Sequence, residues 1–463
     1  MKKTIRAACL LAFAAFSEHA WARGIYVDVN AAPGGDGTRN APVQTIAQAM
    51  ERAREIRRNE HSRIVIHVAP GVYNENFPIY LNISNLALRG STHLIEDDDD
   101  LPGNCGTDSA PVPCVESGTE TLIAPPLPQT VLPQTVGSVL FLVAPTKENA
   151  AAKLTDITIS GFIFDGKATD FASAGDGIGF DRVDNFSINH TVIRDVRIGL
   201  WTRMATGRIQ NNFAYNSADG FEPSGGSELY PATVEVSGNR VTNNPMGGFA
   251  VGTAFVKAKI MDDPNIKEIQ TLFDPRSHPE QVPDKLAIVV IGNDFSRNSS
   301  FGFRFESYVN GDVFYDTTDN QPMTANIMAT VRGNLCRNNG EYGFTVEGAF
   351  PTRTNPRKFT GTFNGSFEDN DCSGTGRAGI FAGFMLNGVV TRNPGLISTN
   401  KYLQDSRFTA RIDDQSLSSG FDYDNPVLDP FDKQTPLNNQ LTINGYALTG
   451  KHVTCPPGLP CVP

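Results

Sequence analysis

Carboxylate and guanidinium side chains recur at fixed places in a set of segments that begin with glycine. Glu306 and Glu347 each stand four residues after such a glycine, and Arg304 stands two residues after one. If the two segments are neighbouring strands, the carboxyl groups lie about 5 Å apart, the separation of a retaining glycosidase pair. Carboxylates this close repel each other, which raises one pKa and supplies an acid beside a base. The pattern predicts a catalytic pair tuned by Arg304, and the alternative is a solvated strand face on which Arg304 neutralises both glutamates.

Earlier segments of the same kind carry a second charged cluster. Asp181 and Arg203 stand four residues after a glycine, and Trp201 and Glu222 stand two residues after one. A guanidinium can hold the carboxylate of a uronic acid bidentately, and a Trp ring offers a flat platform for a sugar. These four residues are therefore predicted to bind substrate. The alternative is an ion pair of Asp181 with Arg203 between neighbouring strands, which is worth little at a surface.

A sequence repeat predicts the elements that bring these residues together. A polar residue is followed by an apolar residue two places on, Asn or Asp at five, Gly at nine and then an alternating apolar strand. The matches are His190/Val192/Asp195/Gly199, Asn211/Phe213/Asn216/Gly220, Asn239/Val241/Asn244/Gly248, Asn293/Phe295/Asn298/Gly302 and Asn334/Cys336/Asn339/Gly343. Gly177, Gly199 and Gly220 lie 22 and 21 residues apart, a period that indicates a solenoid whose turns bury their apolar sides by stacking. Alternation then turns the second and fourth residues after each glycine towards solvent, in two rows along the rod.

This repeat, with its asparagines in the turns, resembles the right-handed parallel β-helix proteins of the pectin-lyase-like superfamily over roughly residues 24–450. The resemblance implies an all-β, single-stranded right-handed parallel β-helix, and helical spacing at residues 45–58 adds an N-terminal capping helix. It is unspecific for chemistry, although lyases of the superfamily often recruit an Arg as base. The expected polysaccharide ligand follows from the strand face itself, which offers an aromatic ring, charged hydrogen-bond partners and a floor as long as a polymer. The motif sets of polygalacturonases, pectin methylesterases and classical pectate lyases are absent, so no specific enzyme family is matched.

The chain divides into five stretches by composition and period. Residues 1–22 form a signal peptide, residues 23–90 the N-terminal cap and first rungs, and residues 91–152 an irregular acidic and Pro-rich excursion read as a solvated surface loop. Parallel β-helix rungs follow at residues 153–405, with inserted loops near 253–285, 307–325, 349–357 and 385–405. The last stretch, residues 406–463, closes the far end.

Charge and targeting signals point to an exported protein. A basic start, the apolar run from Ala7 to Phe16 and small residues up to Ala22 predict a signal peptide cleaved near Ala22, and hence a periplasmic or extracellular protein. The remaining chain holds 36 basic and 49 acidic residues, a formal charge of −13, which argues against nucleic-acid binding. No later run approaches transmembrane length, so no membrane insertion is expected.

The six cysteines that remain after cleavage favour disulfides over metal ligands in an oxidising compartment. Cys105 is predicted to pair with Cys114, and Cys455 with Cys461. Cys336 is placed at an inward position shared with Phe213 and Phe295, and both a buried free thiol and a bond to Cys372 stay open.

No cofactor or metal is expected. Asp28, Asn30 and Asp36 and the acidic run from Glu96 to Asp100 offer oxygen ligands for Ca²⁺, but turn formation and a solvated loop explain them better. The histidines lack metal-ligand spacing.

The function expected from these features is an exported β-helix protein that binds a polysaccharide or oligosaccharide along one strand face and cleaves it as a hydrolase or lyase. The alternative is a non-catalytic binding or structural protein of the cell surface or periplasm.

Overall fold

The computed structural model describes residues 22–125, 139–145, 153–171, 174–226, 232–252, 285–307, 323–340, 342–348, 359–374, 380–382, 385–391, 407–412, 440–443 and 446–449. The predicted signal peptide up to Trp21 and the predicted Cys455–Cys461 pair lie outside these residues. Within them, no helix has the length and apolar character needed to cross a bilayer.

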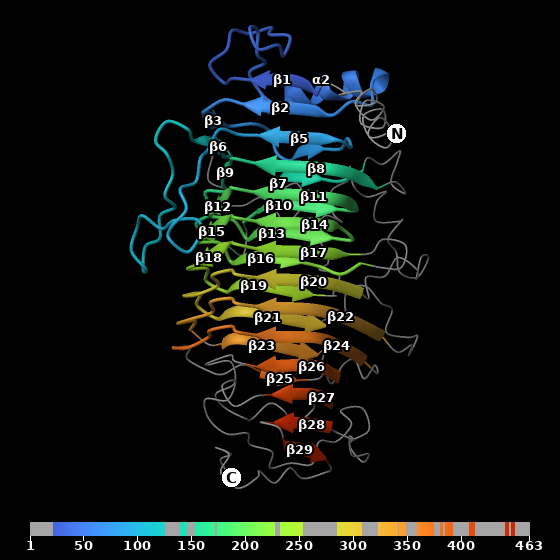
Figure 1. Ribbon diagram of the computed structural model, residues 1–463. Coiled ribbons are helices and arrows are strands. Elements are labelled where there is room, and N and C mark those ends of the chain that lie inside the picture. Colours follow the sequence, from blue (N-terminus) through green and yellow to red (C-terminus); the bar gives the residue numbers. More distant parts are fainter. Residues whose placement is uncertain are drawn as a thin grey trace, which may run out of the picture.

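Three sheets wind along the molecule as a stack of rungs (Figure 1). The fourteen-stranded sheet contains β1 (Arg23–Val27), β2 (Ile64–Val68), β5 (Leu86–Arg89), β8 (Leu154–Ser160), β11 (Val183–Asn189), β14 (Thr206–Gln210), β17 (Thr233–Ser237), β20 (Lys285–Ile291), β22 (Met323–Arg332), β24 (Phe359–Glu368), β26 (Met385–Thr391), β27 (Arg407–Ile412), β28 (Gln440–Ile443) and β29 (Tyr446–Thr449). The nine-stranded sheet contains β4 (Ile79–Leu81), β7 (Val139–Val143), β10 (Asp176–Asp181), β13 (Ile198–Arg203), β16 (Asp219–Pro223), β19 (Gly247–Gly252), β21 (Phe301–Ser307), β23 (Tyr342–Gly348) and β25 (Ile380–Ala382). The six-stranded sheet contains β3 (Gly71–Tyr73), β6 (Thr121–Ile123), β9 (Ile163–Asp165), β12 (Val192–Arg194), β15 (Phe213–Tyr215) and β18 (Arg240–Thr242).

Each turn of the chain adds one strand to each sheet in the same order. The strands β11, β12 and β13 belong to the fourteen-, six- and nine-stranded sheets, and β14 then returns to the first sheet and pairs with β11 in parallel. Beyond β18 the third side continues as single bridges from Arg240 to Asp294, Leu335 and Asp371. At the C-terminal end, β28 and β29 pair antiparallel. The predicted right-handed parallel β-helix fold is confirmed.

Buried asparagines align the corner between the fourteen- and six-stranded sheets. Side chains bond from rung to rung at 2.7–2.9 Å in the order Thr191, Asn212, Asn239, Asn293, Asn334 and Asn370. The residue before each ladder position adopts a left-handed backbone: His190 and Asn211 in the first rungs, then Gly238, Gly292 and Gly333, and Asp369 before Asn370. The repeat match therefore slips by one residue, because Asn212 and not Asn211 is stacked on Asn239.

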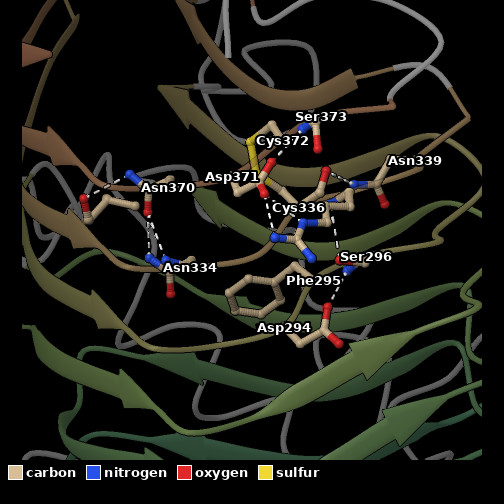
Figure 2. Close-up of a disulfide and its surroundings, with 12 residues drawn as sticks. Asp294, Phe295, Ser296, Asn334, Cys336, Asn339, Asn370, Asp371, Cys372 and Ser373 are labelled. Carbon is tan, nitrogen blue, oxygen red and sulfur yellow. Dashed lines mark hydrogen bonds and ion pairs between the residues drawn. A yellow bond between two sulfur atoms is a disulfide. The ribbon is translucent and has the colours of Figure 1, made fainter. Parts of the chain in front are cut away.

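That slip changes the place of Phe213. It was predicted at an inward position, but it pairs in register with Arg240 and lies on the outer side of the six-stranded sheet with Val192 and Tyr215. Phe295 and Cys336 do lie in the main core. Cys336 is bonded to Cys372 on the next rung, and Figure 2 shows this disulfide beside the Asn334–Asn370 step of the ladder.

Helix α2 (Ile46–Asn59) covers the N-terminal end of the core, as predicted for residues 45–58. Thr45 closes a capping box with Gln48, and Ile46, Met50 and Ala53 are buried against the first rungs. Both carboxylate oxygens of Glu75 accept backbone N–H bonds from the first helical residues, at 2.5 and 2.9 Å. The helix start is therefore fixed to the first turn of the solenoid.

The predicted excursion at residues 91–152 contains two rung strands, β6 and β7. Its first part, residues 94–116, forms a loop closed by the Cys105–Cys114 disulfide, as predicted, and we call it the disulfide loop. The loop, coloured cyan in Figure 1, lies beside the green strands β12, β15 and β18. Glu96, Asp98, Asp99 and Asp100 are exposed, in agreement with the predicted solvated loop, whereas Leu94 of the same loop is buried against the rod. The insertion predicted at residues 385–405 is wrong in part, because residues 385–391 form β26.

Candidate functional site

The backbone register of the nine-stranded sheet brings the predicted site residues into rows. Trp201 pairs with Gly179 on one side and with Glu222 on the other, and Asp181 pairs with Arg203. Further along, Arg304 pairs with Ala250 and Thr345. The predicted alignment is therefore confirmed for these rungs. At β25 it is wrong by one residue, because Thr345 pairs with Ile380 and not with Phe381.

Glu306 and Glu347 are register partners on β21 and β23, so their backbones are neighbours as predicted. Their side chains lie outside the described residues. Their role as a catalytic pair stays a prediction.

Three of the predicted solvent-facing residues are in fact buried. The exposed fraction is 2% for Asp181, 4% for Arg203 and 8% for Trp201. The indole ring of Trp201 lies directly over Gly179, where any Cβ atom would overlap it. Glu222 and Arg304 keep partial exposure. The accessible part of this face is thus near β16 and β21, while the end at β10 and β13 is closed.

Asp181 is held by two arginines. Its Oδ1 and Oδ2 accept bonds from Nε and Nη2 of Arg203 at 2.9 and 2.7 Å, and Oδ2 also accepts from Nη2 of Arg182 at 3.3 Å. Burial acts to raise the pKa of Asp181, but the charges of Arg203 and Arg182 hold it below its ordinary value. The ion pair is a bidentate one in a closed environment, and not the surface pair considered from the sequence.

A second bidentate pair lies at the opposite end of the same strands. Nε and Nη2 of Arg197 donate to Oδ1 and Oδ2 of Asp176 at 2.9 and 2.8 Å. The Asp176 and Arg197 side chains are 10% and 24% exposed. Burial acts against the charge of Arg197, but Asp176, Glu222 and Asp219 raise its pKa. Arg197 is therefore fixed as a cation next to two further carboxyl groups.

Those two carboxyl groups, Asp219 and Glu222, both have raised pKa values, which favours one proton held between them, and we call them the proton-sharing pair. Burial and the neighbouring Asp219 raise the pKa of Glu222 well above its ordinary value, whereas burial raises the pKa of Asp219 to about 6 against the charges of Arg304 and Arg197. The hydrogen bond between them favours a protonated Glu222 and an ionised Asp219. At neutral pH the pair consists of an acid beside a base.

Oδ1 of Asp219 is buried and accepts no hydrogen bond from the described residues. A buried oxygen without a donor costs on the order of 1–3 kcal/mol, so a hydroxyl supplied from outside would stabilise it. Arg304, whose guanidinium carbon lies 5.3 Å from the centroid of Phe301, adds a positive charge near Asp219. The arrangement can give a proton to, and take one from, a hydroxyl-bearing ligand.

The sequence prediction included Glu222 and Arg304 but missed Asp176, Arg197 and Asp219. Strict alternation places residue 219 inward, because Phe221 two residues on is in the core. A signal was present: an Asp stands directly before the glycine of the repeat at Asp176–Gly177 and at Asp219–Gly220. The described residues contain no group of three His, Cys, Asp or Glu side chains placed to hold a metal ion.

Comparisons with known proteins give structural neighbours and no family. No family model matches the chain, and no curated protein matches it. It is similar to a DFA-IIIase from Arthrobacter chlorophenolicus A6, with 14% identity over 85% of this chain and 95% of that chain and a TM-score of 0.38. It is similar to PfbA, a surface adhesin of Streptococcus pneumoniae, with 12% identity over 91% and 90% of the two chains and a TM-score of 0.43. It is also similar to pectate lyase Pel9A, with 13% identity over 87% and 78% of the two chains and a TM-score of 0.39. Similarity at this level carries no argument about activity.

Proposed function

We propose that the protein is an exported β-helix protein that cleaves a glycan on the outer face of the nine-stranded sheet. The observation that carries the proposal is the buried Oδ1 of Asp219, which accepts no hydrogen bond from the described residues. The raised pKa values of Asp219 and the neighbouring Glu222 support it. Trp201, Arg203 and Asp181 form the closed end of the face, and the rungs continue it past β21. A row of rungs suits a polymer because each rung repeats the floor every ~4.8 Å.

In this proposal Glu222 protonates the glycosidic oxygen as its bond to the anomeric carbon breaks. Asp219 accepts a proton from the water that adds to that carbon, so the proton count closes over one turnover. Arg197 and Arg304 favour the ionised form of Asp219. Hydrogen-bonded carboxyl groups lie closer than the ~5 Å of a retaining pair and closer still than the roughly 6.5–9.5 Å of an inverting pair. The proposed step therefore uses a water bound by both carboxyl groups, as in a carboxylate dyad that shares one proton, and forms no covalent intermediate.

The sequence-based pair Glu306 and Glu347 is the competing location on the same sheet. The two are neighbours in register, four residues after the glycines that precede them. The variants Glu306→Gln and Glu347→Gln decide between the locations. If both leave glycan turnover intact, the assignment of catalysis to this pair is wrong.

A non-catalytic binding or structural protein is the second candidate. Two ion pairs, Asp176–Arg197 and Asp181–Arg203, favour this candidate. In each pair the charges of the Asp and the Arg neutralise each other, as on a strand face with no ligand to bind. In that case the rod presents its loops to a partner, and no glycan is consumed.

The test is incubation of the purified protein with a panel of neutral and uronate-containing glycans, followed by reducing-end and unsaturated-uronate assays. We expect one class of glycan to be cleaved by the wild type and by Glu235→Gln, a matched charge removal on β17 of the opposite sheet. Glu222→Gln should be inactive. Full turnover by Glu222→Gln, or no cleavage of any glycan, would contradict the proposal.

A further inference from the structure

Two guanidinium groups of the proposed site already hold carboxylates of this chain. Arg203 binds both oxygens of Asp181, and Arg197 binds both oxygens of Asp176, each through Nε and Nη2 at 2.7–2.9 Å. This parallel two-bond geometry is the one in which an arginine recognises a carboxylate ligand. Both pairs lie on neighbouring strands, β10 and β13, which form one side of the site.

The third arginine of this face is also engaged. Arg304 lies over the ring of Phe301 at 5.3 Å, and its charge acts on Asp219. The charges of the face therefore compensate one another within the chain. A substrate carboxylate placed here would compete with Asp176 or Asp181 for a guanidinium that is already matched.

We infer that Asp176 and Asp181 take the places of ligand carboxylates, so that the glycan bound on this face is uncharged. The inference rests on the proposed function and adds the substrate class to it. It also changes the sequence-based expectation that an arginine here holds a uronate.

Electrostatic repulsion of a substrate carboxylate disfavours a charged glycan, as does the occupation of the arginines by Asp176 and Asp181. An incoming uronate would lie beside Asp176, Asp181 and the negative charge shared by Asp219 and Glu222. In a partly closed site such a contact is screened less than in bulk water. The chain as a whole has a formal charge of −11, which adds a long-range repulsion for polyanions. A sugar hydroxyl meets neither cost and can donate to Oδ1 of Asp219.

The experiment uses pairs of glycans that differ only in charge. Polygalacturonate, polymannuronate and polyglucuronate are each compared with their carboxyl-reduced forms, and binding to the full chain carrying Glu222→Gln is measured by calorimetry so that no ligand is consumed. We expect at least one reduced glycan to bind tenfold or more tightly than its uronate parent. Tighter binding of a uronate form overturns the inference and leaves the proposed function standing.

Binding of none of the six glycans also overturns it. Failure of the proposed function is recognised separately, as the absence of cleavage in the wider panel.

A gain-of-binding variant tests the occupancy argument directly. Asp176→Asn removes the charge matched to Arg197 while keeping the side-chain shape, and we expect uronate affinity to rise about tenfold in a salt-sensitive way. The control is Asp165→Asn, which removes the partner of Arg194 from the six-stranded sheet, where Nε and Nη2 of Arg194 bind Oδ2 of Asp165 at 3.1 and 2.8 Å. Equal uronate affinity in Asp176→Asn and the wild type would show that Asp176 does not set the substrate class.

If Asp176→Asn fails to fold, Asp176→Ser provides the same test at Arg197, because Arg203 lies in the closed end of the face and Asp181→Asn would not expose it to a ligand. The expected result for Asp176→Ser is again a gain in uronate affinity, and an unchanged affinity contradicts the inference.

Discussion

The outer faces of the six- and nine-stranded sheets are built on the same rungs and have different contents. On the six-stranded sheet, Val192, Phe213 and Tyr215 are buried together with Leu94 of the disulfide loop. The charges around them are paired with the loop: Arg240 with Asp97 at 2.7 Å, and Arg297 with Asp108 at 3.0 Å. On the nine-stranded sheet, Asp219 and Glu222 share a proton and have raised pKa values.

The difference between the two faces shows which feature identifies a candidate functional site in a fold whose turns repeat. Each face has an Asp–Arg pair that joins neighbouring strands, Asp165–Arg194 on one and Asp176–Arg197 on the other. Ion pairs alone therefore do not distinguish the faces. Raised carboxyl pKa values do not distinguish them either, because burial and the charge of Asp165 raise the pKa of Asp195 beside the six-stranded sheet. What does distinguish the nine-stranded face is the buried Oδ1 of Asp219, which accepts no hydrogen bond from the described residues, an unmet cost of the kind that proteins retain at functional sites.

The largest expected effect separates activity from stability. Glu222→Gln should lower kcat/KM for the cleaved glycan by about 10²–10⁴-fold, the usual contribution of a general acid, with no loss of thermal stability. Rate measurements and thermal unfolding of the same sample check both parts. A large drop in Tm together with the rate would mean that Glu222 supports the fold, and the contrast between the faces would be lost.

The converse result is expected on the six-stranded sheet. Phe213→Ala should lower the free energy of unfolding by about 3–5 kcal/mol, because a fully buried ring is removed from under the disulfide loop. Glycan turnover below the melting range should be unchanged. Val72→Ala on β3 is the control, since Val72 is 47% exposed and its truncation should cost less than about 0.5 kcal/mol. Equal stabilities of the two variants in denaturant titrations would remove the structural role of this patch.

Opening the disulfide loop should have a smaller effect of the same kind. The double variant Cys105→Ser/Cys114→Ser removes a bridge that closes a short loop, with a sequence separation of 9, and should cost about 2–3 kcal/mol. Hydrogen exchange should increase at β12, β15 and β18 and stay unchanged at β10, β13 and β16. Exchange that rises equally on both faces would show that the loop holds the whole rod and not one face.

The smallest expected effect is a pH slope of stability caused by the proton-sharing pair. The folded-state pKa of Asp219, about 6, lies above the ordinary value of about 3.9, so the folded protein binds this proton more tightly than the unfolded chain. The stability contributed by protonated Asp219 is thus present at low pH and is lost as the pH rises from about 4 to about 6. Unfolding titrations of the wild type and Asp219→Asn should differ by this slope. Parallel pH profiles of the two would contradict the raised pKa.

Much of the fold could be predicted from the sequence, because each rung repeats the same local rules. Gly199 and Gly220, the second residues of β13 and β16, set the phase of alternation, and so Trp201 and Glu222 were aligned correctly. The phase failed at Phe213, because either Asn or Gly satisfies the left-handed corner position and the match could slide by one residue.

The candidate site was less predictable, for two physical reasons. Asp219 lies at the start of a strand, before the glycine of the repeat, and the sequence-based rows included only residues after that glycine. The occupied guanidinium of Arg203 depends on a tertiary contact between rungs, and its burial could not be read from one strand. The sequence showed that charged side chains lie on this face, but it did not show which of them form ion pairs with side chains of a neighbouring rung.

The asparagine ladder has a consequence for how such a protein can be re-engineered. Two residues separate Ser237 from Arg240 at the ladder corner, whereas the chain runs from Gly252 to Lys285 between the nine- and fourteen-stranded sheets. The asparagine column fixes the length of the connection between the fourteen- and six-stranded sheets. The connection between the nine- and fourteen-stranded sheets varies in length from rung to rung. A foreign peptide grafted at the variable corner would lie beside the nine-stranded sheet, at a distance from the asparagine column, so new binding specificities can be screened there on an unaltered scaffold.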